Sequence, residues 1–85
     1  MSVFEYLVDA KVLKIIRLFI QNKEQEYHLH KISTDANVPV ATVFRIVQKL
    51  VKLKLVEPIT IGKMKIYRLA NNSKIKELQK VFKYD

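Results

Sequence analysis

The sequence has no cysteine, one glycine and two prolines among its 85 residues. The lack of cysteine excludes disulfides and thiolate metal sites, although it does not identify the cellular compartment. The scarcity of glycine and proline leaves no flexible linker or low-complexity segment. No apolar run approaches the roughly 18 residues of a membrane span. The opening M-S-V-F-E-Y-L-V-D lacks the basic region and the cleavage site of a signal peptide, so we expect a cytoplasmic protein.

Acidic residues are also scarce, with eight against sixteen lysines and arginines, which gives a net charge of +8 at pH 7. This balance favours an anionic partner: nucleic acid first, and an acidic membrane surface or an acidic protein second. The chain length predicts a single domain, residues 1–85, and the 49% hydrophobic fraction is enough for a folded core. Because so small a core is only marginally stable, burial in a dimer would help it.

The residues of an enzyme site are missing. There is no glycine-rich phosphate loop, no cysteine nucleophile and no evident carboxylate pair, so we expect no catalysis and no small-molecule substrate. His28 and His30 lie two residues apart, where two imidazoles on one face of a strand could begin a metal site. No third ligand is obvious, and we interpret both as ordinary polar histidines, with no metal and no cofactor.

The stretch from Val38 to Val56 organises the rest of the chain, because it is typical of one helix with two different faces. Pro39 suits a first helical turn, where a missing N–H costs nothing. Asn37 tolerates the left-handed conformation that ends a preceding helix. The sequence therefore predicts a helix over residues 39–54.

One face of this predicted helix is apolar and the other is basic. Val43, Val47 and Leu50 recur at i, i+4 and i+7, which indicates a buried stripe. The residues off that stripe include three cations and no acid; they are Val40, Phe44, Arg45, Gln48, Lys49 and Lys52.

The segments before this helix predict a long helix, a short strand and a short helix. Residues 2–22 are expected to be helical, and Asp9 either caps a fresh helix there or lies within a continuous one. Residues 27–29 alternate apolar and polar as a short strand does, and residues 30–36 form a helix of about two turns. Together with residues 39–54, the short helix makes a helix-turn-helix unit over residues 30–54.

After Val56 the period of apolar residues changes from 3.6 to 2, which predicts a β-hairpin over residues 56–69. Gly62 and Lys63 form its two-residue turn, with glycine first as a type II′ turn requires. The last segment, residues 73–84, predicts a helix.

The predicted fold is therefore mainly α with a small β-hairpin, in the order α-β-α-α-β-β-α. It resembles the winged helix-turn-helix domains of small prokaryotic or archaeal transcription regulators of the ArsR-like and MarR-like kind, over roughly residues 9–70. Members commonly carry Ser/Thr-Val-x-Arg in the recognition helix, here residues 42–45, and end that helix in Gly-Leu-Val, here residues 54–56. Lys54 stands where the family has glycine, so it is expected to hold a left-handed backbone.

The resemblance implies a sequence-specific regulator of transcription that binds double-stranded DNA. Residues 39–54 would lie in the major groove and the wing, residues 61–66, on the adjacent backbone or minor groove. Charge agrees, because Pro39 to Leu69 holds seven cations and one acid, 7 − 1 = +6 of the total +8. The candidates for base contacts are Val40, Ala41, Phe44 and Arg45; the candidates for phosphate contacts are Thr42, Gln48, Lys49, Lys52, Lys63 and Lys65.

Related regulators are usually two-fold dimers, so we expect a homodimer formed by the two terminal helices. Ile15 and Leu18 fall outside the apolar stripe of the first helix, and contact either a second subunit or the chain's own last helix. The alternative is that the last helix only closes the monomer core. The candidate interface residues are Phe4, Leu7, Leu78, Val81 and Phe82.

A protein-interaction module is the rival function. Some winged helices of transcription or chromosome machinery bind proteins rather than DNA, and Val40, Phe44 and Ile46 would then form an apolar docking patch. Salt discriminates the two, because DNA binding weakens steeply with salt and an apolar contact does not.

Overall fold

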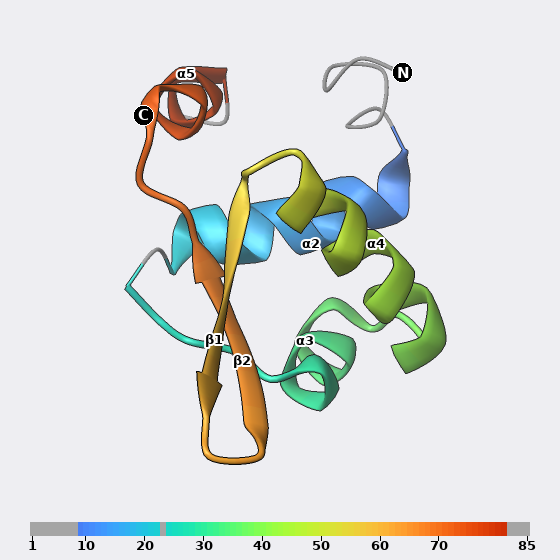
Figure 1. Cartoon of the computed structure of the whole chain (residues 1–85). Coiled ribbons are helices and arrows are strands. Elements are labelled where there is room, and N and C mark those ends of the chain that lie inside the picture. Colours follow the sequence, from blue (N-terminus) through green and yellow to red (C-terminus); the bar gives the residue numbers. More distant parts are fainter. Residues whose placement is uncertain (1–8, 23, 82–85) are drawn as a thin grey trace.

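The computed structural model describes residues 9–22 and 24–81, and it places three helices ahead of a β-hairpin and a last helix (Figure 1). This order confirms the predicted mainly α fold with a hairpin. The elements are α2 (Ala10–Gln21), α3 (Leu29–Ala36), α4 (Val40–Lys52), β1 (Val56–Ile61), β2 (Met64–Leu69) and α5 (Ser73–Val81).

Helix α2 begins afresh after Asp9. The Asp9 backbone is extended, and its Oδ1 accepts hydrogen bonds from the N–H groups of the second and third helical residues at 2.9 and 3.3 Å. Of the two alternatives predicted for Asp9, the cap of a fresh helix is confirmed and a helix over residues 2–22 that continues through this residue is wrong, because an extended residue cannot lie inside a helix. Residues 2–8 of that prediction lie outside the described residues.

The core lies where α2, α3 and α4 meet the base of the hairpin. Ile15 is fully buried within the single chain and needs no partner subunit, and Leu18 packs half-buried against the same core. The rings of Phe19 and Tyr27 meet edge to face, with centroids 5.4 Å apart, an arrangement that aromatic pairs favour. This core fixes the helix-turn-helix unit against the hairpin.

The strand predicted over residues 27–29 is reduced to a single bridge. Tyr27 and Tyr67 exchange two backbone hydrogen bonds of 2.8 and 2.7 Å, which attach the loop before α3 to β2. The chain then turns into α3 at Leu29, one residue earlier than predicted. His28 is the reason, because its Nδ1 accepts from the N–H three residues on at 3.2 Å and caps the helix.

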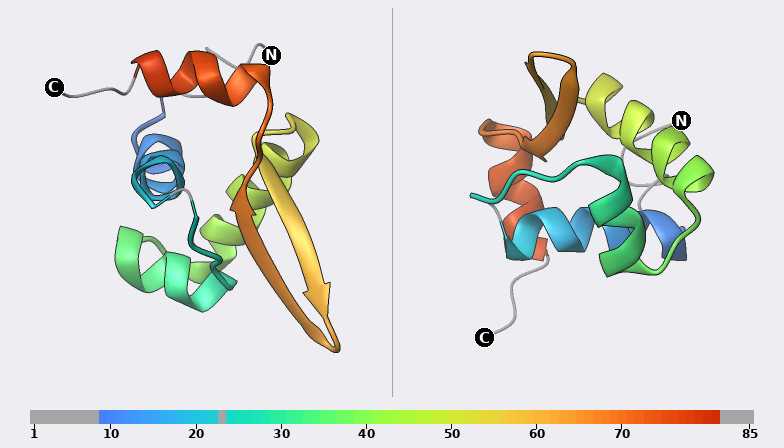
Figure 2. Two further views of the ribbon diagram at one scale, coloured as in Figure 1. Left: turned by 90° about the vertical axis from the view of Figure 1, so that its left-hand side faces the viewer. Right: turned by 90° about the horizontal axis from the view of Figure 1, so that it is seen from below.

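The hairpin projects past the helices as a two-stranded arm, which the left view in Figure 2 shows from the side. Ile61 pairs with Met64 next to the turn, and Val56 pairs with Leu69 at the base. Gly62 has a φ of 61°, as the first central residue of the predicted two-residue turn requires.

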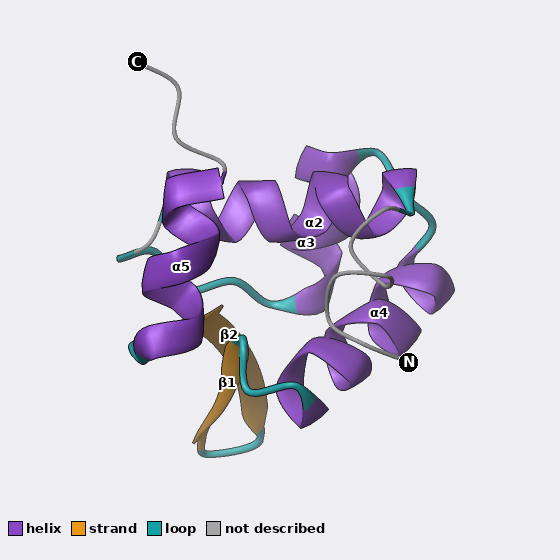
Figure 3. Cartoon of the chain, turned by 90° about the horizontal axis from the view of Figure 1, so that it is seen from above, coloured by secondary structure: helices purple, strands orange, loops and turns teal. Residues whose placement is uncertain are grey.

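Helix α5 is fixed to the end of α4 and lies beside the base of the hairpin (Figure 3). Asn72 Oδ1 caps α5 by accepting from the Ile75 N–H at 3.1 Å, and Asn72 Nδ2 donates to the Lys54 carbonyl at 2.8 Å. Lys74 Nζ donates to the Leu53 carbonyl at 3.3 Å. Residues 82–84 of the predicted helix lie outside the described residues.

The described helices include none with the length and apolar character that crossing a lipid bilayer demands.

Candidate nucleic-acid interface

A three-residue turn joins α3 to α4 and sets the angle between them. Asn37 adopts the left-handed conformation, with φ 55° and ψ 51°, and its N–H reaches back to the last carbonyls of α3. Ser33 Oγ donates to the Val38 carbonyl at 2.6 Å and closes the turn. The conformation predicted for Asn37 is confirmed.

Helix α4 begins at Val40, one residue later than predicted. Pro39 has a ψ of 141°, which is extended, so it is the N-cap rather than a residue of the first turn. Its carbonyl accepts the first helical hydrogen bond, from Val43 N–H at 3.0 Å. A proline suits this position, since no intrahelical acceptor exists there for an N–H.

A Schellman motif ends α4. The Leu55 N–H donates to the Leu50 carbonyl at 2.9 Å and the Lys54 N–H to the Val51 carbonyl at 3.0 Å. Lys54 itself has a φ of 63°, so the left-handed backbone expected from the missing glycine is confirmed. Leu50 and Leu55 are both fully buried and anchor the motif in the core.

The two faces of α4 are distinct in the structure. Its buried face consists of Val43, Ile46, Val47 and Leu50. Ile46 is only 6% exposed, so it belongs to the core and cannot contribute to the apolar docking patch considered for a protein partner. The outer face begins at Val40 and runs to Lys52.

All four candidates for base contacts are exposed along the first half of α4: Val40, Ala41, Phe44 and Arg45. Phe44 is 49% exposed and Val40 37% exposed, so neither side chain is buried in the core. Arg45 Nη2 lies 3.5 Å from Thr42 Oγ1, one turn earlier. The helix therefore presents two large apolar side chains and one guanidinium outward.

The candidates for phosphate contacts lie at several places around that face. On α4, Lys52 is exposed, while Thr42, Gln48 and Lys49 are half-buried. Gln48 Nε2 donates to the Tyr67 hydroxyl at 3.4 Å, so this amide links α4 to β2. The remaining two candidates, Lys63 and Lys65, are exposed on the hairpin.

The structure pairs the one acid of this surface with a cation. Glu57, the only acid between Pro39 and Leu69, lies opposite Arg68 and forms a salt bridge with it, with Nε and Oε1 3.1 Å apart. The other cations of that span are Arg45, Lys49, Lys52, Lys54, Lys63 and Lys65. Helix α4 and the hairpin therefore combine a one-signed electrostatic field with exposed apolar groups.

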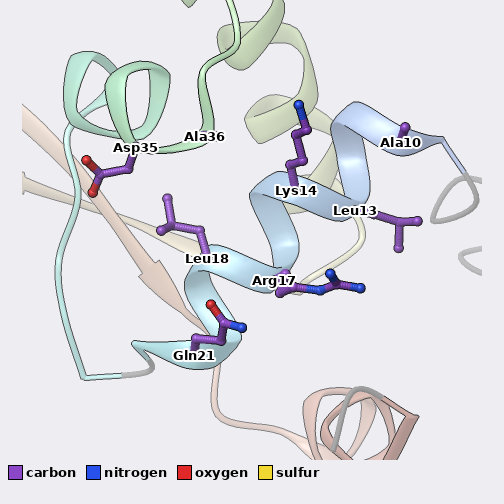
Figure 4. A pocket seen from close by; sticks show the side chains of 8 residues that line it. All are labelled: Ala10, Leu13, Lys14, Arg17, Leu18, Gln21, Asp35 and Ala36. Carbon is purple, nitrogen blue, oxygen red and sulfur yellow. The ribbon is translucent and has the colours of Figure 1, made fainter. Parts of the chain in front are cut away.

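A hollow lies between α2 and α3, and the charges that line it differ from those of the surface on α4 and the hairpin (Figure 4). Lys14 and Arg17 line it from α2, and Asp35 lines it from α3, where Asp35 also pairs with Lys31 at 3.2 Å. Because both signs of charge line this hollow, it lacks the uniform field that attracts a polyanion.

Burial raises the pKa of the Tyr27 hydroxyl above its ordinary value of 10, and the charge of Asp35 raises this pKa further.

The predicted dimer residues fall largely beyond the described part of the chain. Phe4, Leu7 and Phe82 lie outside the described residues, and Val81 is the last residue of α5. Leu78 is half-buried and packs against the chain's own core, as expected if α5 closes the monomer.

Sequence reasoning missed three groups near this surface. The link between Gln48 and Tyr67 joins residues 19 positions apart and left no local signal. The hydrogen bond from Asn72 Nδ2 to the Lys54 carbonyl, after the end of α4, likewise left no local signal in the sequence. Ile61 and Met64 are 55% and 52% exposed at the hairpin tip, and the apolar residues on both sides of the turn were a signal that could have been used.

Comparison with known proteins agrees with this geometry. A family model described as the IclR helix-turn-helix domain matches residues 10–59. HlyU from Vibrio cholerae superposes with a TM-score of 0.75 at 12% identity, covering 94% of this chain and 83% of that chain. No curated protein matches the sequence.

Two further solved structures share the fold. A homodimeric winged helix-turn-helix DNA-binding domain from Mycobacterium bovis, a possible ArsR-family transcriptional regulator, has a TM-score of 0.74 at 25% identity, over 94% of this chain and 70% of that chain. AF1382 from Archaeoglobus fulgidus has a TM-score of 0.68 at 23% identity, over 99% and 100% of the two chains. The predicted resemblance to winged helix-turn-helix regulators is confirmed.

Proposed function

The chain belongs to the IclR helix-turn-helix domain family and is a DNA-binding transcription regulator. From this premise we propose that it reads specific sequences in double-stranded DNA through α4 and the wing. We further propose that the protein forms one domain, residues 1–85, and binds DNA as a homodimer. One observation carries the proposal. Residues 39–69 hold six cations besides Arg68, and the only acid of that span is paired with Arg68.

Helix α4 is the proposed reader of the major groove. Its 13 residues span about 20 Å, and the groove is about 12 Å wide, so the helix fits with its first half nearest the bases. Arg45 would grip guanine O6 and N7 with two hydrogen bonds. Val40, Ala41 and Phe44 can contribute only apolar contacts, such as contacts with a thymine methyl.

Phosphate contacts would set affinity and register. Thr42, Lys49 and Lys52 border the α4 face, and Lys63 and Lys65 extend it along the wing. Gln48 can reach a phosphate only by giving up its hydrogen bond to Tyr67, so we assign it the lesser role among these residues.

A homodimer would place two α4 helices on one face of the duplex, on half-sites about 10 bp apart. The candidate surfaces remain the two ends of the chain, with Phe4, Leu7, Leu78, Val81 and Phe82. The homodimeric state of the Mycobacterium bovis domain supports this proposal.

The test is fluorescence anisotropy with a random 30-bp duplex across a salt series. The variant Arg45→Ala, Lys49→Ala, Lys65→Ala removes three charges from the proposed surface. The control Lys11→Ala, Lys14→Ala, Lys76→Ala removes three exposed charges from α2 and α5, so both variants have a net charge of 8 − 3 = +5. We expect wild type and control to bind with a steep salt dependence. The surface variant should bind weakly with a slope lower by about 2, because Lys49 and Lys65 are its two proposed phosphate contacts.

Two results would contradict the proposal. Equal weakening in the two variants would mean that overall charge, not this surface, attracts DNA. No binding at low salt by the folded protein would favour the rival function, with a protein partner docking on Val40 and Phe44.

A further inference from the structure

Two exposed apolar side chains are not used by the proposed function. Among the described residues, the exposed large apolar groups are Val40, Phe44, Ile61 and Met64. The first two belong to the proposed reading face of α4. Ile61 and Met64 instead pair directly across the hairpin beside the turn, with more than half of each side chain in solvent. Such a pair is costly in water unless something covers it.

The tip pair continues an apolar stripe along one face of the hairpin. Directly opposed residues in an antiparallel pair point to the same side, and every second pair shares that side. Ile59 and Ile66 are the next pair on the face of Ile61 and Met64. The following pair on this face is Glu57 and Arg68, which form the salt bridge, whereas Tyr67 and Leu69 lie on the opposite face. The stripe is therefore confined to the outer half of the hairpin.

The shape of the tip restricts what can cover it. Figure 1 shows the hairpin as an arm whose turn points away from α5, and the left view of Figure 2 shows the same arm from another side. The strand backbones of such an arm lie about 4.8 Å apart, and the side chains make it wider. A partner that covers both Ile61 and Met64 must therefore curve around the end of the arm.

The charge of the tip indicates that this concave partner is anionic. Lys63 lies in the turn and Lys65 follows the tip pair, and both are exposed. Residues 58–67 contain no acid. The DNA minor groove is concave and bordered by phosphates, and apolar side chains that unstack a base step distort it from its ordinary width of about 6 Å.

The resemblance to winged helix-turn-helix regulators already implies a wing near the minor groove; we propose that Ile61 and Met64 act there as an apolar wedge against a base step and bend the duplex. Lys63 and Lys65 hold the phosphates on both sides. Apolar wedges of this kind partly unstack one step, which is easiest at pyrimidine–purine steps such as TA. The wing tip thus supplies specificity through DNA deformability at a position that α4 does not touch. This inference rests on the proposed function.

The experiment compares two double variants of the full chain on a 30-bp duplex labelled at both ends for energy transfer. Ile61→Thr, Met64→Gln removes the wedge but keeps the β-propensity at position 61 and the side-chain length at position 64. Lys63→Gln, Lys65→Gln removes the flanking charges and keeps the wedge. Because all four side chains are exposed, thermal unfolding should be unchanged and serves as the check of folding.

We expect the two variants to fail in different ways. Loss of the wedge should weaken binding about tenfold at every salt concentration, leave the salt slope unchanged and abolish the bend. Loss of the lysines should lower the salt slope by about 2 and keep the bend. Netropsin, which fills the minor groove of A·T-rich DNA, should weaken binding of wild type and leave the wedge variant unaffected.

Two results overturn the inference and are distinguishable. If the wedge variant binds and bends DNA as wild type does, the inference is wrong and the proposed function stands. If wild type itself has no affinity for the duplex at low salt, both are wrong.

Discussion

Lys54 occupies a backbone conformation that costs a lysine free energy. Three described residues have a positive φ: Asn37 at the end of α3, Lys54 after α4 and Gly62 in the wing. Glycine adopts this region freely and asparagine tolerates it, but for lysine the contact between Cβ and the carbonyl costs roughly 1 kcal/mol. The Schellman hydrogen bonds and the buried pair Leu50 and Leu55 hold Lys54 there.

Replacing this lysine with glycine should therefore stabilise the protein. We expect Lys54→Gly to raise the free energy of unfolding by about 0.5–1 kcal/mol in urea denaturation, since the removal of Cβ strain exceeds the added entropy of the unfolded chain. Lys54→Ala is the matched control, because it removes the same charge and keeps Cβ. A glycine variant no more stable than the alanine variant would show that the strain is negligible.

At the residue scale, the sequence patterns predicted which residues adopt a left-handed backbone better than they predicted which side chains are buried. Asn37 and Lys54 were predictable, because each stands at the end of a periodic segment where a left-handed residue is needed. Ile46 was not, because the pattern of α4 indicated one stripe, whereas the helix packs against both α3 and β1 and buries a wider arc. The exposure of Phe44 depends on the same packing.

At the scale of elements, Asn72 joins three of them. Its Oδ1 caps α5 while its Nδ2 holds the Lys54 carbonyl between α4 and β1. One side chain therefore fixes the last helix to the point where the recognition helix becomes the wing.

Two substitutions should separate these roles in urea denaturation. Asn72→Ala removes both hydrogen bonds, and we expect it to lower the free energy of unfolding by about 1–3 kcal/mol. Asn72→Asp keeps the capping oxygen but loses the Nδ2 donor, so its cost should lie between wild type and alanine. If the aspartate variant were as unstable as the alanine variant, the cap would contribute nothing.

Elements with a local signal were predictable and those set by distant contacts were not. The hairpin follows from its period of two and its glycine turn. The strand predicted over residues 27–29 failed because its only pairing is with Tyr67, 40 positions away, which no local pattern reports. The structure begins α3 one residue earlier than the sequence predicts, because His28 caps the helix with a ring nitrogen, which is unusual.

At the scale of the whole molecule, the predicted assembly can be tested without DNA. If two copies associate through the ends of the chain, sedimentation at micromolar concentration should give twice the chain mass of 10.0 kDa, 2 × 10.0 = 20 kDa. The variant Phe4→Ser, Phe82→Ser should shift this to the mass of one chain, because it removes two apolar groups from the proposed interface.

A mass of 10.0 kDa for wild type would refute the dimer. The α4 surface would then read a single site in each molecule. The sequence could not decide this point, because the same apolar residues of a last helix serve a monomer core or an interface equally well, as the half-buried Leu78 illustrates.

The strict alternation of the wing limits how its length can change. Lengthening each strand by one residue would extend the arm by about 3.4 Å but would turn Ile61 and Met64 to the opposite face. Only an insertion of two residues per strand, roughly 7 Å, keeps both side chains on their present side. The reach of the wing therefore changes in steps, and an insertion that keeps the tip chemistry must add two residues to each strand between the base of the hairpin and the pair Ile61 and Met64.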